Sequence, residues 1–125
     1  MTAAGEKPHH LAAWLGDRAP AGPALIIVEG ILARTTATSL EGLLATLLNK
    51  ARGPTSLDLT DLDIEDTEGM LALVDLLRAQ QRAGVALTLI GAPRALGHNL
   101  YRARLVEGPN GIRLVDMRQD EPFIG

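Results

Sequence analysis

The chain contains no cysteine, few aromatic residues and no excess of positive charge, and each shortage excludes a class of protein. Without cysteine there is no disulfide, no thiolate metal site and no cysteine nucleophile. The only aromatic residues are Trp14, Tyr101 and Phe123, so the chain offers few aromatic side chains on which the bases of a single-stranded nucleic acid could stack. The net charge of −3 and the pI near 5.5 also lack the basic footprint of nucleic-acid binding. We therefore expect no nucleic-acid partner.

Long apolar runs are also missing, which bears on where the protein acts. The N-terminal residues show no basic start followed by an apolar run, so we expect no secretory signal. The longest apolar-rich helical stretch carries Asp75, Arg78 and Arg82, which a membrane-spanning helix would not tolerate. We expect a cytoplasmic protein without direct membrane insertion.

The 125 residues suffice for one domain with a single core, and the hydrophobic pattern predicts its class. The order of periodic segments predicts an α/β domain with a mostly parallel sheet of four to five strands, flanked by helices. Strands are expected at 24–28, 56–62, 85–90 and 112–115. Helices are expected from Thr38 to a stop at Gly53 and Pro54, from about Thr67 to Arg82, and over 94–105. The continuous apolar run from Ala24 to Val28 predicts a strand buried on both faces.

The ends of the chain differ in composition from this periodic part. Residues 1–23 are rich in Ala, Gly and Pro, and we expect a partly ordered lead-in whose conformation the sequence leaves open. The domain proper is expected to span residues 24–116, with 117–125 as a C-terminal tail. Within the domain, Thr38 and Glu41 match a capping box, so the first helix is expected to begin at Thr38.

An acidic loop between the second strand and the second helix concentrates most of the polar chemistry. It leads to Thr67, which we expect in the first turn of that helix, beyond the carboxyl end of a parallel strand, where partners usually bind. Either Asp66 or Thr67 could cap the helix. A phosphate on Thr67 would add about −1.5 to −2 charges to the docking surface. The loop is therefore a candidate binding switch with Thr67 as the phosphoacceptor.

Other functions of the acidic loop are less consistent with its spacing. Its carboxylates offer oxygen ligands for Mg²⁺ or Ca²⁺, and they are Asp58, Asp61, Asp63, Glu65 and Asp66. The spacing does not match an EF-hand, and a regular strand would point Asp58 and Asp61 to opposite faces. A solvated acidic loop is the favoured interpretation, and we expect no metal site.

Enzyme signatures are absent elsewhere. The sequence contains no GxxxxGK[ST] or GxGxxG phosphate-binding motif and no GxSxG nucleophile motif. An aspartyl-phosphate receiver is disfavoured because the only lysines are Lys7 and Lys50. His9 and His10 fall in the lead-in, and His98 alone carries little weight as a catalytic base. We expect a protein without enzymatic activity and without a cofactor.

Four segments of the chain resemble the STAS family, which includes the bacterial anti-sigma factor antagonists. The family's D-L-[S/T] strand and its D-[S/T]-x-G-[L/M] helix start resemble residues 58–60 and 66–70, at matching separation. Its G-x-L segment and its G-x-x-[L/V]-x-[L/V] strand resemble residues 29–32 and 84–91. The resemblance covers about residues 24–116 and implies a SpoIIAA-like fold.

The resemblance also implies a function for the acidic loop. In antagonists of the family, the dephosphorylated form binds an anti-sigma factor that is also a GHKL-type serine kinase, and phosphorylation by that kinase ends the interaction. By this resemblance Thr67 is the phosphoacceptor, and the partner-binding surface around it comprises Asp63, Asp66, Thr67, Glu68, Gly69 and Met70.

Two features depart from the antagonists. Most of them carry serine where this chain has Thr67, and Glu68 replaces a residue that is usually small. Threonine at this position resembles the small STAS subunit of bacterial phospholipid-transport ABC complexes, which binds an ATPase subunit. An accessory role of that kind is the alternative function.

Overall fold

The computed structural model describes residues 11–16, 23–51 and 53–118. Secondary structure covers most of these residues. In chain order the elements are β1 (Ala12–Leu15), β2 (Ala24–Leu32), α1 (Ala37–Ala51), β3 (Thr55–Ile64), α2 (Thr67–Arg82), β4 (Leu87–Ile90), α3 (Arg94–Arg102) and β5 (Arg113–Val115).

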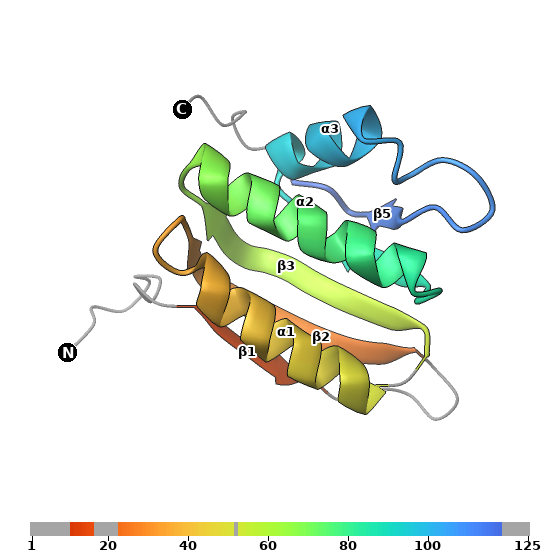
Figure 1. Ribbon diagram of the computed structural model, residues 1–125, viewed down its shortest axis with the longest axis horizontal. Coiled ribbons are helices and arrows are strands. Elements are labelled where there is room, and N and C mark those ends of the chain that lie inside the picture. The colour runs from red at the N-terminus through yellow and green to blue at the C-terminus, as the bar shows by residue number, and fades with distance from the viewer. Residues whose placement is uncertain (1–10, 17–22, 52, 119–125) are drawn as a thin grey trace.

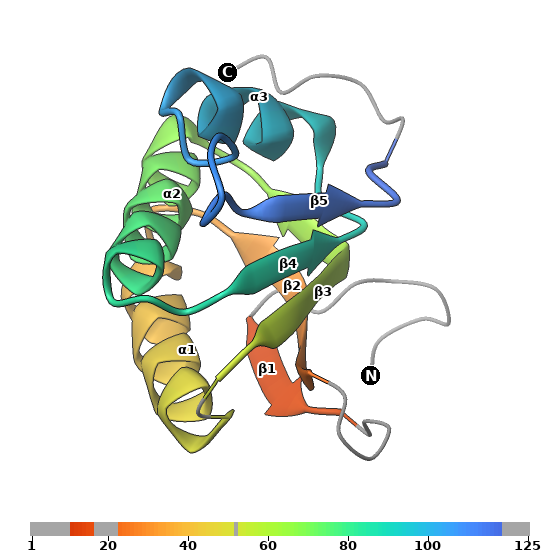
Figure 2. The same cartoon turned by 90° about the vertical axis from the view of Figure 1, so that its right-hand side faces the viewer.

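One five-stranded sheet forms the centre of the molecule, with the spatial order β1-β2-β3-β4-β5 (Figure 1). Strands β2 to β5 are parallel, and β1 joins the edge antiparallel to β2. This confirms the predicted α/β class and the mostly parallel sheet. Because the parallel strands follow one another in space as in sequence, right-handed crossovers place successive helices on the same side. Figure 2 shows α1 and α2 along one face of the sheet and no helix over the other.

The core lies between the helices and the covered face of the sheet, and it is aliphatic because the chain has so few aromatic residues. Its largest fully buried side chains are Ile26, Leu32, Leu40, Leu44, Leu57, Leu59, Leu62, Leu73, Leu77, Leu89, Leu96 and Leu100. The prediction that residues 24–28 are buried on both faces was wrong. Burial alternates along β2, and Leu25 and Ile27 are only half-buried because no helix covers their side.

The first strand of the sheet lies within the lead-in, whose conformation the sequence left open. Residues Ala12 to Leu15 pair with β2 in the register Ala12 to Glu29 and Trp14 to Ile27. Leu11, directly before the strand, is buried in the core.

The start of α1 differs from the prediction. The helix begins at Ala37, and Thr38 is an exposed residue of its first turn, so the proposed capping box was wrong. The Leu40 amide donates to the Thr36 carbonyl (3.1 Å). The Thr36 hydroxyl accepts from the Ala33 amide (2.9 Å) and donates to the Ile31 carbonyl (2.9 Å). Thr36 therefore closes the loop before α1 and sets where the helix begins.

Among the described helices, none has the length and apolar character needed to cross a bilayer.

Candidate functional site

Two loops meet at the carboxyl ends of β2 and β3, where the sequence predicted a binding surface. One loop joins β2 to α1 and the other joins β3 to α2. The Glu65 amide donates to the Leu32 carbonyl (2.8 Å), which continues the β2–β3 pairing to the start of both loops. The two loops are therefore neighbours in space although more than thirty residues separate them.

Asp66 links the two loops through its side chain. As the N-cap of α2 it has an extended backbone (φ −143°, ψ 171°), and its Oδ1 accepts from the Gly69 amide at 2.8 Å. The same carboxylate accepts from the Arg34 amide, with Oδ1 at 3.1 Å and Oδ2 at 3.0 Å. Of the two cap candidates that the sequence offered, Asp66 is the cap.

These hydrogen bonds favour the ionised carboxylate. The Arg34 amide and then the Gly69 amide lower the pKa of Asp66, desolvation opposes them, and the Arg34 guanidinium lowers it further. Asp66 is therefore a carboxylate at neutral pH, and it is committed to holding the loop rather than available as a general base.

Gly69 lets α2 approach the other loop closely. A Cβ at this position would lie 3.0 Å from the Ala33 Cα and 3.0 Å from the Leu32 carbonyl oxygen. These are backbone atoms, which cannot move aside as a side chain could. Gly69 is buried for this reason, and Met70 beside it is 3% exposed and belongs to the core. Both residues support the surface from below and present little of themselves to a partner in this conformation.

The exposed residues around these loops form what we call the α2 N-terminal surface, namely Arg34, Thr35, Glu65, Thr67 and Glu68. Thr67 is the first residue of α2, and no described residue makes a hydrogen bond to its hydroxyl. Arg34 and Thr35 were not among the predicted site residues. Only their position after β2 could have indicated them, because parallel strands end at the same edge of the sheet.

Asp63 lies at the margin of this surface, near the end of β3. Its carboxylate is half-exposed and its Oδ1 lies 3.9 Å from Nη1 of Arg118. The Arg118 guanidinium also donates to the Thr60 and Leu62 carbonyls. Arg118 thus anchors the residues after β5 to the exposed side of β3.

A β-bulge in β3 overturns the expectation that Asp58 and Asp61 face opposite sides. Asp58 pairs with Ile27 and Asp61 with Glu29, so the two residues Leu59 and Thr60 of β3 oppose the single residue Val28 of β2. Ile27 and Glu29 lie on one face, and both aspartates therefore lie on that face, away from the helices. The spacing of the apolar residues in the sequence could have indicated the bulge. Leu59 and Leu62 are both buried, yet on an unbroken strand residues three apart would lie on opposite faces of the sheet.

In the described part of the chain we find no arrangement of side chains suited to metal binding or to acid–base chemistry. No three carboxylate or histidine side chains there are grouped to hold a metal ion. Asp58 accepts from the Thr60 amide (3.0 Å), on a different side from Asp66. His98 is exposed on α3, whereas His9 and His10 lie outside the described residues. A hollow of about 370 Å³ lies at the opposite end of the sheet, beside the first residues of β3 and β4.

Comparisons with known proteins agree with the fold. The family model described as "Mlab, STAS domain" matches residues 15–116. A solved structure from Shewanella loihica PV-4, an uncharacterized protein of the DUF3478 family with a SpoIIAA-like fold, is similar in fold. That likeness has a TM-score of 0.54 at 15% identity and covers 96% of this chain and 93% of the other. No curated protein matches the sequence. Because the family model spans most of the chain, the protein belongs to the STAS domain family.

Proposed function

We propose that the protein is a cytoplasmic interaction module of the anti-sigma factor antagonist type, switched by phosphorylation of Thr67. Its partner is an anti-sigma factor that is also a GHKL-type serine kinase. The observation that carries the proposal is the division of roles at the start of α2. Asp66 makes the structural hydrogen bonds, and the neighbouring Thr67 hydroxyl is exposed and makes none to a described residue.

The division of roles would let Thr67 be modified without loss of the fold. A phosphate there would meet the positive end of the helix dipole, which tolerates an anion. It would also stand beside the exposed Glu65 and Glu68 carboxylates and raise the negative charge of the α2 N-terminal surface. A partner fitted to the hydroxyl would lose affinity through like-charge repulsion and desolvation.

The residues of the proposed binding surface then act in two ways. Thr67 and Glu68 contact the partner directly, with Asp63 at the margin. Asp66, Gly69 and Met70 hold the first turn of α2 in place beneath them. No catalytic group and no cofactor takes part in this function.

An accessory subunit of an ABC-type phospholipid transporter is the second candidate, with the transporter's ATPase as the partner. It is favoured by Thr67, which resembles the threonine of such STAS subunits, and by the Mlab description of the matching family model. In that case the same surface binds the ATPase, and the Thr67 hydroxyl is a contact that needs no phosphate.

The test is a pull-down from the source organism's lysate with wild type, Thr67→Ala and Thr67→Glu. Thr38→Glu is the matched control, because Thr38 is an exposed threonine in the first turn of the neighbouring helix α1. We expect wild type, Thr67→Ala and Thr38→Glu to recover a GHKL-type kinase and Thr67→Glu to lose it, with phosphate on wild-type Thr67.

Other outcomes separate the candidates. Recovery of an ABC ATPase or permease would replace the first candidate with the second. Equal recovery of one partner by Thr67→Glu and wild type would contradict a switch at Thr67, since the added charge lies at the centre of the proposed contact.

A further inference from the structure

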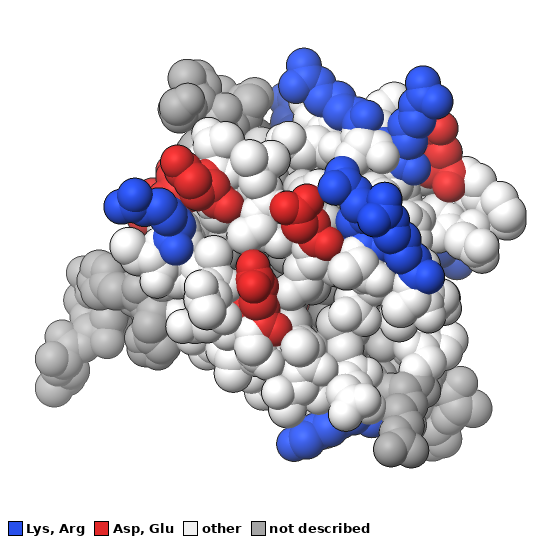
Figure 3. Space-filling view, viewed as in Figure 1, with Lys and Arg blue, Asp and Glu red and all other residues white. Residues whose placement is uncertain are grey.

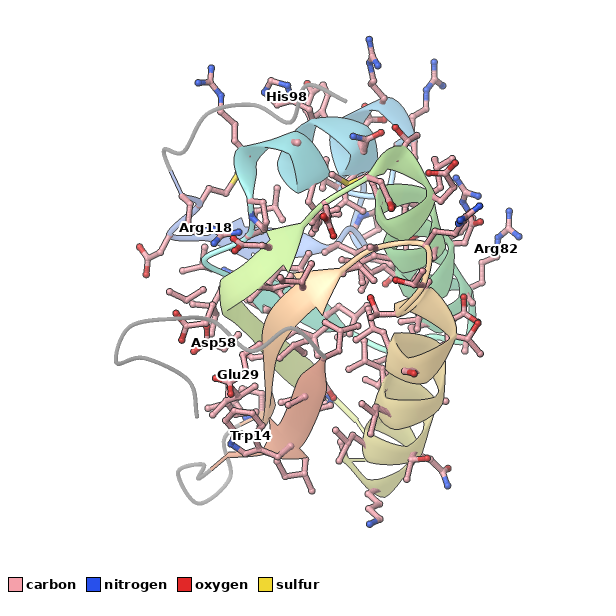
Figure 4. The ribbon with its side chains drawn as sticks, turned by 90° about the vertical axis from the view of Figure 1, so that its left-hand side faces the viewer. Trp14, Glu29, Asp58, Arg82, His98 and Arg118 are labelled. Carbon is pink, nitrogen blue, oxygen red and sulfur yellow. The ribbon has the colours of Figure 1, made fainter. Side chains whose placement is uncertain are left out.

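The face of the sheet that carries no helix is a second surface, distinct from the α2 N-terminal surface. We call it the open face and define it by Trp14, Ile27, Glu29, Asp58 and Asp61. Figure 4 shows Trp14, Glu29 and Asp58 projecting from the sheet on the side away from the helices. Trp14, the only tryptophan of the chain, is 40% exposed there.

Three carboxylates lie on the open face, two of them at facing positions. Asp61 lies directly across from Glu29 on the neighbouring strand, and Asp58 lies opposite Ile27, two residues before Glu29. Like charges at facing positions of a sheet repel one another. Within residues 11–16, 23–51 and 53–118, neither Glu29 nor Asp61 forms an ion pair that would relieve this repulsion. The Arg118 guanidinium lies on the same side of β3, but it is held by the Thr60 and Leu62 carbonyls. The carboxylates of the open face therefore still favour an incoming cation, and Trp14 offers an aromatic face for cation–π contact.

Helix α3 carries the complementary charge. Its nine residues include two arginines and no carboxylate, whereas the whole chain has a net charge of −3. Arg102 and Arg104 are exposed, and Tyr101 next to Arg102 in sequence is 67% exposed. In Figure 3 basic side chains predominate along the upper edge of the molecule, over α3. We call this the α3 outer face; His98, which also belongs to it, points away from the sheet in Figure 4.

We propose that two copies of this chain associate head to tail, with the α3 outer face of one copy on the open face of the other. Arg102 and Arg104 of the first copy pair with Glu29 and Asp61 of the second, where a guanidinium can bind a carboxylate through two hydrogen bonds. A guanidinium over the Trp14 ring adds a cation–π contact.

A second copy is the occupant because both halves of the complementary pair lie on the same chain. The two faces point in different directions from one molecule, so a copy cannot satisfy its own open face with its own α3 (Figure 4). The contact joins two different surfaces, so a pair of copies still has one open face and one α3 outer face free. The association should therefore grow with concentration rather than stop at a closed dimer.

Sedimentation equilibrium of the full chain, at about 0.01 M and about 1 M salt, tests the proposal because salt screens exposed charges over this range. Over a hundredfold range of protein concentration, we expect the average mass to rise above the 13.3 kDa of one chain at low salt and to return to it at high salt. Trp14 fluorescence should change along the same concentration curve. A mass of one chain under all conditions would overturn the proposal.

Charge reversal identifies the two surfaces. Arg102→Glu and Asp61→Lys should each weaken self-association at least tenfold. An equimolar mixture of the two should associate again, because the first variant keeps its open face and the second keeps its α3. Arg82→Glu and Glu41→Lys make the same charge changes at exposed sites on α2 and α1, and should associate like wild type. Association that is unaffected by Arg102→Glu and Asp61→Lys, or a mixture that stays monomeric, would refute the head-to-tail contact.

Discussion

The close approach of α2 to the β2–α1 loop can be tested by adding one methyl group at Gly69. In Gly69→Ala the new Cβ would lie 3.0 Å from the Ala33 Cα and from the Leu32 carbonyl oxygen, and 3.1 Å from the Ala33 amide nitrogen. All three atoms belong to the backbone, so relief requires that the loop and the helix move apart by a few tenths of an ångström. We expect the variant to fold with lower stability.

The expected free-energy change is the difference between two opposing effects. Overpacking a tight site typically costs about 1–3 kcal/mol. Replacing glycine by alanine in a helix gains up to about 1 kcal/mol, and less in the first turn. Gly69→Ala should therefore be destabilised by about 0.5–2 kcal/mol. For a chain of this size each kcal/mol corresponds to a fall in Tm of roughly 3–6 °C.

Gly42→Ala is the matched control, since Gly42 lies inside α1 and an added Cβ would meet no atom within 4 Å. It should be stabilised by about 0.5–1 kcal/mol, because only the helix preference changes. Urea unfolding followed by circular dichroism measures both variants. Amide hydrogen exchange should be faster at Arg34 in Gly69→Ala, because its hydrogen bond to Asp66 spans the widened contact. If Gly69→Ala gained as much stability as Gly42→Ala, the close packing of the two loops would be refuted.

Two further predictions concern the side chains that tie the loops and strands together. The lowered pKa of Asp66 means that its stabilising effect is fully present above the unfolded pKa of about 3.9 and is lost as pH falls through the lower folded value. The difference in urea midpoint between wild type and Asp66→Asn should thus shrink as the pH falls from about 5 through the lowered folded pKa of Asp66, and a constant difference would count against the assignment. Arg118→Met removes the charged donors to the Thr60 and Leu62 carbonyls and should lower stability by about 1–3 kcal/mol, as measured by urea unfolding. Arg113→Met, at an exposed site on β5, should change stability little, and equal losses in the two variants would refute the anchoring role of Arg118.

Most of the fold followed from local patterns because the helices and strands here have clear hydrophobic periodicity. The start of α1, which was predicted at the wrong residue, shows what local sequence patterns cannot predict. A capping box fits Thr38 by sequence, but the helix starts at Ala37 because the Thr36 hydroxyl bonds to the Ile31 carbonyl at the end of β2. The sequence around Thr36 alone carries no sign of that hydrogen bond.

The candidate site, like the fold, could be predicted in part from the sequence. The sequence placed Thr67 in the first turn of α2 but left the cap open between Asp66 and Thr67. The choice depends on the Arg34 amide, which is 32 residues away along the chain. Likewise, the sequence placed Gly69 on the partner-binding surface, but its close neighbour is the backbone of Ala33 in the same chain. Contacts between the two loops decide the roles, and no single segment encodes them.

Because of these contacts, substitutions at neighbouring positions of the α2 N-terminal surface should have different effects on the two loops. Asp66 holds the Arg34 and Gly69 amides together, so a substitution there loosens both loops at once. Thr67 is one residue further along and takes no part in these hydrogen bonds. A change of charge at Thr67 can therefore alter what a partner meets while the loops keep their arrangement. This separation depends on the cap being aspartate rather than Thr67 itself, because modification of a capping threonine would rearrange the hydrogen bond that holds the start of the helix.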